Sequence, residues 1–400
     1  MNSKKIAFII ILLANACIIA FFWCILPFCT DDGLFSIQIN YINSVEPKNL
    51  TIKIKPIILL WTPWFNDKWP LRYGNMKCGH VQCHLTDNHS QYWDSDAVIF
   101  HGASSKITNR RYYPSRYHRG TYQLWVYNSM ENPFVTDSES RRLSSFHNNL
   151  FHVMMTYSQD ADIISCYGRA YQGRHKNYDP HRNYAKGKTK LIAWIASACY
   201  PGRTNFVRQL NKYIPIDMFG KCGNKICKRD SSCGKQLARD YKFYLSFENF
   251  ICKDYITEKF YRNAIDNNLI PIVVGGGQYN NSNIVPPHSY IDVMDFSTIQ
   301  DLANFIIKVN NSDTLYNSYF KWKLSYSIQS HCPIEESFCD LCQKLHVKEW
   351  IIHKSQNAIS NLTRRWGNNK DNCLDYPQIF DRKSTRITSH SFKYHKPTDG

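Results

Sequence analysis

The stretch 241–277 holds the side chains whose types and spacing best suit chemistry. Glu258 and Lys259 fall in the first turns of a predicted helix, where the helix dipole and free backbone N–H groups favour an anion. A lysine there can neutralise phosphate oxygens, a glutamate can accept two hydrogen bonds from a ribose diol, and Tyr255 adds a flat face. This pattern predicts a nucleotide-diphosphate site, although a capped surface helix has the same pattern.

The elements that must position this site follow from the same stretch. Asp254 is a suitable N-cap, and apolar residues then recur at i, i+4 and i+8, which gives a helix one buried face. Residues 269–274 form a continuous apolar strand, and the three glycines at 275–277 allow a sharp turn after it. The predicted order is therefore strand, polar turn, helix and strand.

Short apolar runs separated by polar stretches occur along most of the chain. The segment 179–190 is polar and basic, and we interpret it as a linker between two halves. Strands alternating with helices predict parallel α/β sheets, which bind ligands at the carboxyl ends of their strands. Residues 221–236 are rich in Cys, Lys and Gly and predict a loop held by disulfides. The predicted strands are 57–61, 97–100, 124–127 and 162–165 before the linker, and 190–195 and 216–219 after it.

An uncharged apolar run near the N-terminus predicts a membrane anchor. Ile6–Cys29 comprises 24 residues without a charge, and about 20 helical residues span a bilayer core. Lysines at 4–5 precede the run and aspartates at 31–32 follow it, so the positive-inside rule places the remainder of the chain across the membrane. A cleaved signal peptide is the alternative, but its apolar region is usually shorter and ends in small residues.

Cysteines and glycosylation sequons indicate the secretory pathway. Of the 15 cysteines, three lie in or beside the apolar run, which leaves an even number for disulfides in an oxidising lumen. Asn-x-Ser/Thr sequons are used only in that pathway. They begin at Asn49, Asn88, Asn280, Asn310 and Asn361.

The composition fits a globular protein with a basic surface. Apolar residues make up 43% and charged residues 20% of the 400 residues, and the formal net charge is +17. Such a charge suits a nucleotide-sugar diphosphate, an anionic glycoprotein or a membrane face. A nucleic-acid partner is not expected, because the sequence offers no nucleic-acid-binding motif and such a role conflicts with a lumenal location.

Several segments together resemble one known family. Phe247–Asn249, Asp254–Lys259 and Pro271–Gly275 resemble the donor-binding signature of the α1,3-fucosyltransferases, glycosyltransferase family ten. The resemblance covers roughly residues 57–345 and implies an inverting transfer of L-fucose from GDP-β-L-fucose to an acceptor hydroxyl, with an α-linked product. Further blocks in the family's order are 59–63, 83–86 with 96–101, 125–126 with 130–133, and 339–342.

The resemblance also implies roles for particular residues. Glu131 matches the family's general base, which removes the proton of the acceptor hydroxyl. Arg203 matches an arginine that reaches the diphosphate, with Arg208 as the nearby alternative. The implied donor-binding residues are Tyr255, Glu258, Lys259, Asn249 and Arg203.

No cofactor is expected beyond the co-substrate. Lys and Arg can neutralise the phosphates, and no Asp-x-Asp motif is present, so a metal is not required, although stimulation by a divalent ion is compatible with this chemistry. The resemblance implies that Cys78 and Cys83 pair with Cys339 and Cys342. A zinc site remains the alternative, formed by Cys332, Cys339 and Cys342 with His331 or His346.

The resemblance implies an α/β protein of GT-B fold, with two facing Rossmann-like domains behind a single N-terminal transmembrane anchor. We expect a single-pass type II protein of the Golgi membrane with its catalytic domain in the lumen. The expected parts are a cytosolic tail 1–5, the anchor 6–29, a stem 30–55, an acceptor domain 56–185, a GDP-fucose-binding domain 186–345, and a basic tail 346–400, mobile from 364.

The expected activity is formation of an α1,3 linkage to O3 of a GlcNAc on a glycoprotein or glycolipid. The acceptor is either an antennal GlcNAc or the innermost GlcNAc of an N-glycan core. A catalytically silent, membrane-anchored protein that binds glycans or nucleotide sugars is the alternative. Ala198 stands where the family usually has Asn, and 101–103 replaces a more polar segment, so these departures can affect activity or acceptor choice.

Overall fold

The computed structural model describes residues 50–115, 119–137, 143–176, 178–227, 231–381 and 386–387. The predicted anchor at 6–29, the tail before it and nearly all of the predicted stem lie outside these residues. Among the residues that are described, no helix has the length and apolar character needed to cross a membrane. The chain from Ile52 onward forms one compact unit, to which the following description refers.

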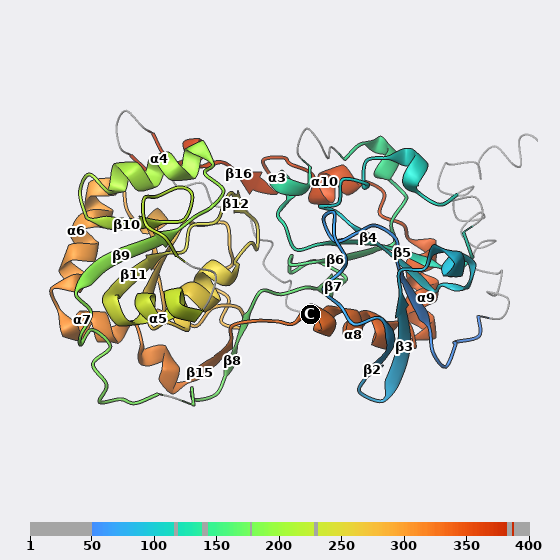
Figure 1. The fold of residues 1–400 in the computed structure, drawn as a ribbon, viewed down its shortest axis with the longest axis horizontal. Helices are drawn as coiled ribbons and strands as arrows, with labels where there is room; N and C mark the ends of the chain where they lie inside the picture. The colour runs from blue at the N-terminus through green and yellow to red at the C-terminus, as the bar shows by residue number, and fades with distance from the viewer. Residues whose placement is uncertain are drawn as a thin grey trace, which may run out of the picture. The chain divides into compact units, whose positions relative to one another are not determined.

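The first half of this unit builds a seven-stranded sheet in the order β2-β3-β1-β4-β5-β6-β7 (Figure 1). Neighbouring strands are parallel except β2 and β3, which form an antiparallel hairpin. Strands β1, β4 and β5 are almost wholly apolar, as expected for parallel strands covered on both faces. The bounds are β1 Ile57–Leu60, β2 Gly74–Cys78, β3 Val81–Thr86, β4 Ala97–His101, β5 Leu124–Ser129, β6 Val153–Thr156 and β7 Ile163–Ile164.

The second half builds a separate parallel sheet of five strands in the order β10-β9-β11-β13-β14. Its strand order reverses between β9 and β11, since β10 lies on one side of β9 and all later strands lie on the other. Two mainly parallel sheets with helices confirm the expected α/β class. The bounds are β9 Lys190–Ile195, β10 Ile216–Phe219, β11 Tyr241–Leu245, β13 Ile270–Val273 and β14 Ile291–Asp292.

Helices cover both faces of the second sheet. One face packs against α4, α6, α7 and α11 in a single large apolar cluster, and the other packs against α5 and the π-helical segment η7. Helix α5 falls partly within 221–236, where we expected only a loop. The bounds are α4 Pro201–Leu210, α5 Ser231–Asp240, η7 Lys259–Ile265, α6 Ile299–Asn310, α7 Asp313–Ser318 and α11 Tyr376–Ile379.

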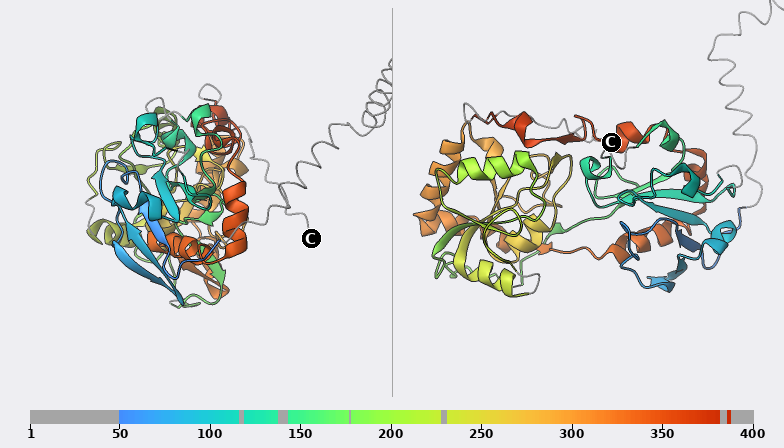
Figure 2. Two further views of the ribbon diagram at one scale, coloured as in Figure 1. Left: turned by 90° about the vertical axis from the view of Figure 1, so that its right-hand side faces the viewer. Right: turned by 45° about the horizontal axis from the view of Figure 1, so that its top comes forward.

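The first sheet is covered by helices that come from the end of the chain (Figure 2). Phe338 of α8 packs with Ile58, whereas Trp366 of α10 packs with the cluster around Leu59. Because adjacent strand residues point to opposite faces, α8 and α10 lie on opposite faces of the sheet. The bounds are α8 Ile334–Lys344, α9 Lys348–Gln356 and α10 Leu362–Trp366.

Short elements complete the fold and join the two sheets. Strands β8 and β15 pair where the chain passes between the two sheets, and β12 pairs with β16. These elements are β8 Arg169–Gln172, β12 Ile251–Cys252, β15 Tyr326–Gln329, β16 Cys373–Leu374, α3 Pro133–Thr136, η2 His89–Asp94, η3 Arg110–Tyr112, η6 Ser145–His147, η8 Val293–Asp295 and η9 Lys321–Leu324.

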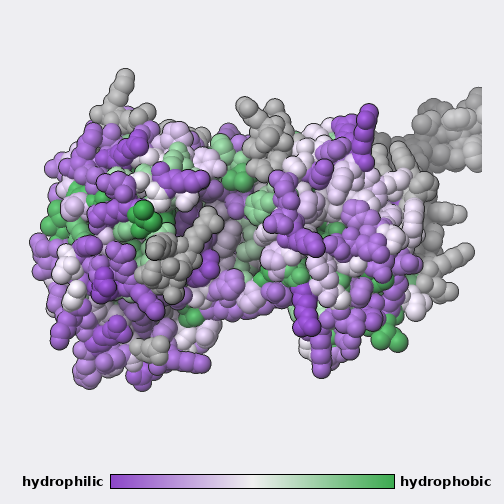
Figure 3. Space-filling model, viewed as in Figure 1, coloured by the Kyte–Doolittle hydropathy of each residue, from purple (hydrophilic) through white to green (hydrophobic). Residues whose placement is uncertain are grey.

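Figure 3 shows that one face of the molecule is mainly hydrophilic, with only small apolar areas.

The segment after residue 345 is folded as far as the structure describes it, so the expectation of a basic tail that is mobile from 364 is wrong for residues 348–381. It contains α9, α10, β16 and α11, and Cys373 of β16 forms a disulfide with Cys252 of β12. The Tyr376 hydroxyl donates to the backbone oxygen of Glu248 at 2.8 Å. The elements of this segment are short and are separated by polar residues, so its apolar residues form no long periodic run in the sequence. We call residues 367–379 the C-terminal strap.

Six disulfides join all twelve cysteines beyond the N-terminal apolar run. They include the two pairs that the resemblance implied, which tie the hairpin β2–β3 to α8. Since Cys332, Cys339 and Cys342 each belong to a different disulfide, the alternative zinc site is wrong. The pairs are Cys78–Cys339, Cys83–Cys342, Cys166–Cys332, Cys199–Cys222, Cys227–Cys233 and Cys252–Cys373.

Candidate active site

A cavity of about 300 Å³ lies at the carboxyl ends of strands from both sheets. Strands β9 and β11 end beside it, where the order of the second sheet reverses, and such switch points are where open α/β sheets bind ligands. The loop after β5 brings a residue from the first sheet. All six predicted site residues line this cavity, namely Glu131, Arg203, Asn249, Tyr255, Glu258 and Lys259.

Lys259 is the central cation of the cavity and lies between two carboxylates. Its Nζ is 2.9 Å from Oε2 of Glu248 and 3.2 Å from Oε1 of Glu258. It also donates to the Thr257 hydroxyl at 2.9 Å. The lysine is therefore held in place at the lining of the cavity before any ligand arrives.

The pKa values of these groups follow from burial and from one another. Burial opposes the charged form of Lys259, but the nearby Glu248 and Glu258 outweigh it and raise the lysine pKa. Burial raises the pKa of Glu248 despite the attraction of the lysine. The pKa of Glu258 is lowered, because Lys259 and its hydrogen bonds outweigh the effect of burial. The lysine is therefore charged at neutral pH.

The local backbone differs from the helix start that we predicted. Asp254 is not an N-cap: it has a φ of 62°, and its carboxylate accepts from Gln278 Nε2 at 2.7 Å and from the Gln159 amide at 2.9 Å. The helical segment begins only at Lys259, and the Thr257 amide already donates to Glu248. The charge of Lys259, rather than free amides of a helix end, is what this segment offers to an anion.

Glu131 reaches the cavity from the first sheet, in the turn between β5 and α3. Its backbone oxygen accepts from the Ser129 hydroxyl at 2.9 Å. The next residue, Asn132, caps α3 by accepting from the Val135 amide. Its Nδ2 donates at 2.7 Å to Oδ1 of Asn249, which follows β11 of the second sheet. This bond fixes the turn that carries Glu131 against the loop that carries Asn249.

Arg203 lines the cavity but is engaged mainly with the backbone. Its guanidinium donates to the backbone oxygens of Phe247 at 3.1 Å and Ala198 at 2.6 Å, and it lies over the Trp194 ring. Its Nε has no hydrogen-bond partner among the described atoms. Arg203 thus joins the loops after β9 and β11. The alternative, Arg208, is exposed on α4 and does not line the cavity.

Three tyrosines form the wall between the two sheets. The Tyr255 ring lies 4.7 Å from that of Tyr157 and 6.0 Å from that of Tyr167. Burial raises the pKa of Tyr255 well above its usual value, and neighbouring groups including Tyr167 and Glu131 add to the effect. The Tyr167 hydroxyl donates to the backbone oxygen of Met130 at 2.6 Å. These phenols therefore stay neutral and serve as rigid, partly polar walls.

Sequence reasoning missed four residues that shape the cavity. Glu248 stands in the quoted signature, directly after β11, and a polar residue at that position is a signal for a site. Asn132 likewise follows a strand, after β5. Thr257 and Tyr167 act through contacts that no local pattern reveals. The two differences from the family pattern that were noted in the sequence lie in different places. Ala198 lines the cavity, whereas His101 is buried among Trp64, Phe65 and Trp69.

Two groups of potential metal ligands occur among the described residues, but their cysteines are not available. One group is Cys83, Cys342 and His346, and the other is Cys166, Cys332 and Glu336. In each group the two cysteines are joined to one another by a disulfide. Neither group can supply a thiolate, which is the form of cysteine that binds metal.

Two parallel sheets with a charged cavity at their carboxyl ends are typical of α/β enzymes that act on nucleotide derivatives, and comparison with known proteins narrows this class to glycosyltransferases. The family model described as "Glycosyltransferase family 10 (fucosyltransferase) C-term" matches residues 185–364, and the "Fucosyltransferase, N-terminal" model matches residues 53–168. The chain therefore belongs to glycosyltransferase family 10, the fucosyltransferases, which confirms the resemblance seen in the sequence.

Curated relatives agree with this assignment. The chain is 32% identical over 334 residues to alpha-(1,3)-fucosyltransferase C of Drosophila melanogaster, and the match covers 75% of each chain. It is also 32% identical over 293 residues to human 4-galactosyl-N-acetylglucosaminide 3-alpha-L-fucosyltransferase FUT6, which covers 72% of this chain and 79% of the relative. It is similar to glycoprotein 3-alpha-L-fucosyltransferase A of Drosophila melanogaster, at 33% identity over 78% of this chain and 61% of that protein.

A crystal structure of an alpha1,3-fucosyltransferase with GDP also matches, with a TM-score of 0.43 and 15% identity, over 82% of this chain and 97% of that one.

Proposed function

We propose that this protein transfers L-fucose from GDP-β-L-fucose to O3 of a GlcNAc residue on a glycoprotein or glycolipid, with inversion, to form an α1,3 linkage. One observation carries the proposal: a single cavity holds Glu131 from the first sheet together with Lys259 from the second. A carboxylate and a cation on separate walls suit a reaction in which one side loses a proton and the other gains negative charge.

In the proposed reaction, the Glu131 carboxylate accepts the proton of the acceptor hydroxyl. The hydroxyl oxygen then attacks C1 of fucose from the face opposite GDP, so a new C–O bond forms as the bond between C1 and the phosphate oxygen breaks. GDP leaves with the electron pair, and Lys259 stabilises its charge. Attack on the face opposite the leaving group converts the β donor into an α product.

Donor binding changes the partners of Lys259. In the free protein its Nζ contacts two carboxylates and a hydroxyl, so a phosphate must replace at least one of them. Glu258 is the exchangeable partner, because its side chain is 32% exposed whereas that of Glu248 is 6% exposed. Glu258 is then released to accept hydrogen bonds from the ribose diol. Asn249 and Tyr255 line the remaining part of the donor site, and Arg203 holds its loops.

The acceptor has two candidates in the names of the relatives. The human relative is named for a galactosyl-N-acetylglucosaminide, which corresponds to an antennal GlcNAc, and one insect relative is named for a glycoprotein. A membrane-anchored binding protein without activity is the second candidate function. The presence of both Glu131 and Lys259 in one cavity favours the enzyme.

The remaining parts of the proposal concern architecture and location. We propose a GT-B enzyme whose two sheets bind acceptor and donor, anchored in the Golgi membrane as a single-pass type II protein. The support is the uncharged run Ile6–Cys29, the six disulfides and the sequons. We propose that it has no nucleic-acid partner.

The test is transfer of labelled fucose by the full-length protein to a panel of acceptors with antennal or core GlcNAc, with and without divalent metal. We expect Glu131→Gln to lower kcat by about 10²–10⁴-fold, since it removes the general base while keeping the shape of the side chain. Glu349→Gln, on the exposed side of α9, is the matched control and should behave as wild type.

Undiminished transfer by Glu131→Gln would show that another group is the base. If the wild-type protein binds GDP but neither transfers nor hydrolyses the donor, the binding-protein alternative replaces the enzyme.

A further inference from the structure

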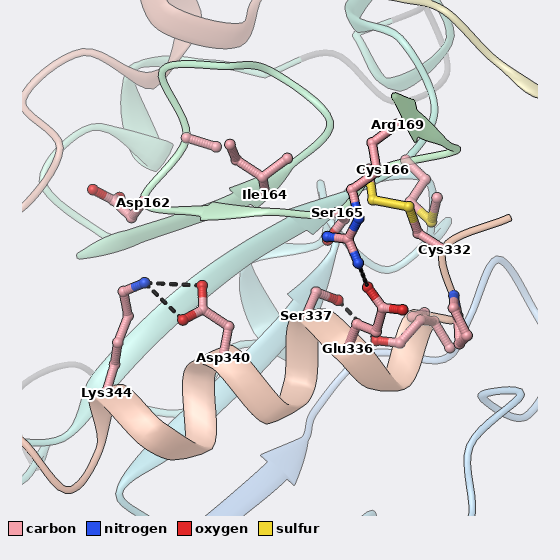
Figure 4. Close-up of a pocket in the computed structure, with 14 residues that line it drawn as sticks. Asp162, Ile164, Ser165, Cys166, Arg169, Cys332, Glu336, Ser337, Asp340 and Lys344 are labelled. Carbon is pink, nitrogen blue, oxygen red and sulfur yellow. Dashed lines mark hydrogen bonds and ion pairs between the residues drawn. A yellow bond between two sulfur atoms is a disulfide. The ribbon is translucent and has the colours of Figure 1, made fainter. Parts of the chain in front are cut away.

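A second cavity, of about 330 Å³, lies between α8 and the end of the first sheet (Figure 4). Glu336, Asp340 and Lys344 of α8 line one side of it. Ile164 at the end of β7 lines the opposite side. We call it the α8 cavity. None of the predicted site residues lines it, and it has no role in the proposed reaction.

The α8 cavity is separated from the donor cavity by a thin wall. Met130 lines the α8 cavity, whereas the next residue, Glu131, lines the donor cavity. In the same way, Cys166 lines the α8 cavity, whereas the next residue, Tyr167, lines the donor cavity. The bond from the Tyr167 hydroxyl to the Met130 oxygen closes this wall. The two cavities therefore lie on either side of the same backbone segments.

The lining suits a neutral polyhydroxy compound. Arg169 pairs with Glu336 at 2.7 Å, and Lys344 pairs with Asp340 at 2.8 Å. These four side chains are 31–49% exposed, so they keep capacity for hydrogen bonds to hydroxyl groups. Charges of both signs, each paired, favour a ligand without net charge over an anion or a cation.

Two further features point to a sugar ring. Ile164 is 41% exposed and offers an apolar surface, which matches the C–H face of a sugar. The hydroxyl of Ser165, a residue that is 3% exposed, has no hydrogen-bond partner among the described atoms, although buried hydroxyls are normally paired. An unpaired buried hydroxyl beside a polar cavity is a group that a ligand can satisfy.

We propose that the α8 cavity binds the sugar residue of the acceptor glycan that is attached at the reducing end of the residue whose hydroxyl reacts. This inference rests on the proposed function, because it assumes a glycan acceptor at Glu131. It makes the enzyme prefer an extended oligosaccharide to a minimal one. The preference for an extended oligosaccharide depends on Arg169, Ile164 and their neighbours, whereas the binding of GDP-fucose is independent of these residues.

The test compares three acceptors of the full-length protein: the disaccharide galactosyl-N-acetylglucosamine, a tetrasaccharide of two such units, and the disaccharide attached to a short peptide. Ile164→Trp fills the cavity at an exposed position, and Arg169→Gln removes a hydrogen-bonding cation. Arg239→Gln is the matched control, because it removes an exposed arginine from an Arg–Asp pair on α5, outside the cavity. The measured quantity is the ratio of kcat/KM between acceptors.

We expect wild type to favour the tetrasaccharide, and both cavity variants to lower that preference about tenfold, with KM for GDP-fucose unchanged. Arg239→Gln should keep the wild-type preference. Equal activity of wild type on both oligosaccharides, or an equal loss on both in the variants, would overturn the proposal. If the cavity variants lower activity only on the glycopeptide, the α8 cavity binds peptide rather than sugar, and the proposal is wrong.

Failure of the proposed function gives a different result. If wild type transfers no fucose to any acceptor, binding of the tetrasaccharide is measured directly by saturation-transfer NMR in the presence of GDP. Binding that is lost in Ile164→Trp and kept in Arg239→Gln supports the glycan site independently of catalysis. Binding that is the same in both variants overturns it.

Discussion

At the residue scale, Lys259 has a structural role as well as the proposed catalytic one. It neutralises Glu248, whose side chain is only 6% exposed. Removing one partner of a buried pair leaves an uncompensated charge, which costs about 3–5 kcal/mol. We therefore expect Lys259→Met to lower the free energy of unfolding by about that amount, as measured by denaturant unfolding, in addition to abolishing transfer.

The double variant Glu248→Gln with Lys259→Met separates the two roles. It removes both charges, so we expect it to recover most of the stability while transfer stays at the background level. Recovery of transfer together with stability would mean that Lys259 acts only by holding the fold.

Asp292, at the end of β14, predicts a pH-dependent contribution to stability. Burial raises its pKa to about 6, against an ordinary value of 3.8. Above about pH 6 the carboxylate is ionised in both states and the folded state carries the penalty, whereas below about pH 3 it is protonated in both and the penalty is absent. Asp292→Asn should therefore be more stable than wild type at pH 7.5, by up to about 3 kcal/mol.

This difference should disappear on acidification to about pH 3, as measured by urea unfolding at the two pH values. The Met294 amide donates to the Asp292 side chain, and asparagine can still accept that bond. A stability difference that is independent of pH would contradict the prediction.

The residues of the site could be predicted where a motif carried them, and could not where contacts across the fold defined them. Lys259, Glu258 and Glu131 follow directly from the signature and from the ends of strands. Glu248 stands in the same signature, but its ion pair with Lys259 depends on how closely η7 approaches the end of β11. Asp254 failed as a helix cap because its carboxylate binds residues that are remote in sequence, such as Gln159.

At the element scale, the C-terminal strap supports the donor site by contacting the loop after β11. Tyr376 is fully buried, and its hydroxyl is bonded to the backbone oxygen of Glu248. We expect Tyr376→Phe to cost about 1–3 kcal/mol, since it leaves a buried carbonyl unpaired, and also to raise KM for GDP-fucose. The measurements are thermal unfolding and steady-state kinetics.

Tyr316→Phe is the matched control for this variant. Tyr316 is equally buried, and its hydroxyl donates to the Lys242 oxygen at 2.8 Å, on the same sheet but away from the cavity lining. It should lose similar stability with no change in KM. An unchanged KM in Tyr376→Phe would limit the strap to a structural role.

Elements with continuous apolar runs were predictable, and those held by distant partners were not. The bounds of β9 and β10 coincide with the predicted strands 190–195 and 216–219. The hairpin β2–β3 has a weak pattern, and it is held by disulfides to α8. The strap was missed because its elements are short, and its apolar residues are buried only by contact with surfaces formed by other parts of the chain.

At the scale of the whole molecule, the chain builds the first sheet, then the second, and returns to cover the first. Helices α8 to α10 belong in sequence to the end of the chain, but they pack on the sheet formed at its beginning. The strap then runs back to the second sheet through Cys373 and Tyr376. The two sheets therefore share one continuous set of connections, and neither has its full covering without the last segment.

This return has a consequence during synthesis. Cys78 precedes its partner by 261 residues, which corresponds to roughly 13–50 s of translation. Throughout that interval Cys78 and Cys83 are thiols without their final partners, while the cysteines of other pairs emerge between them. Premature pairing has to be reversed by thiol–disulfide exchange. Folding of this protein should therefore depend strongly on disulfide isomerase, more than that of a protein whose cysteines pair with near neighbours.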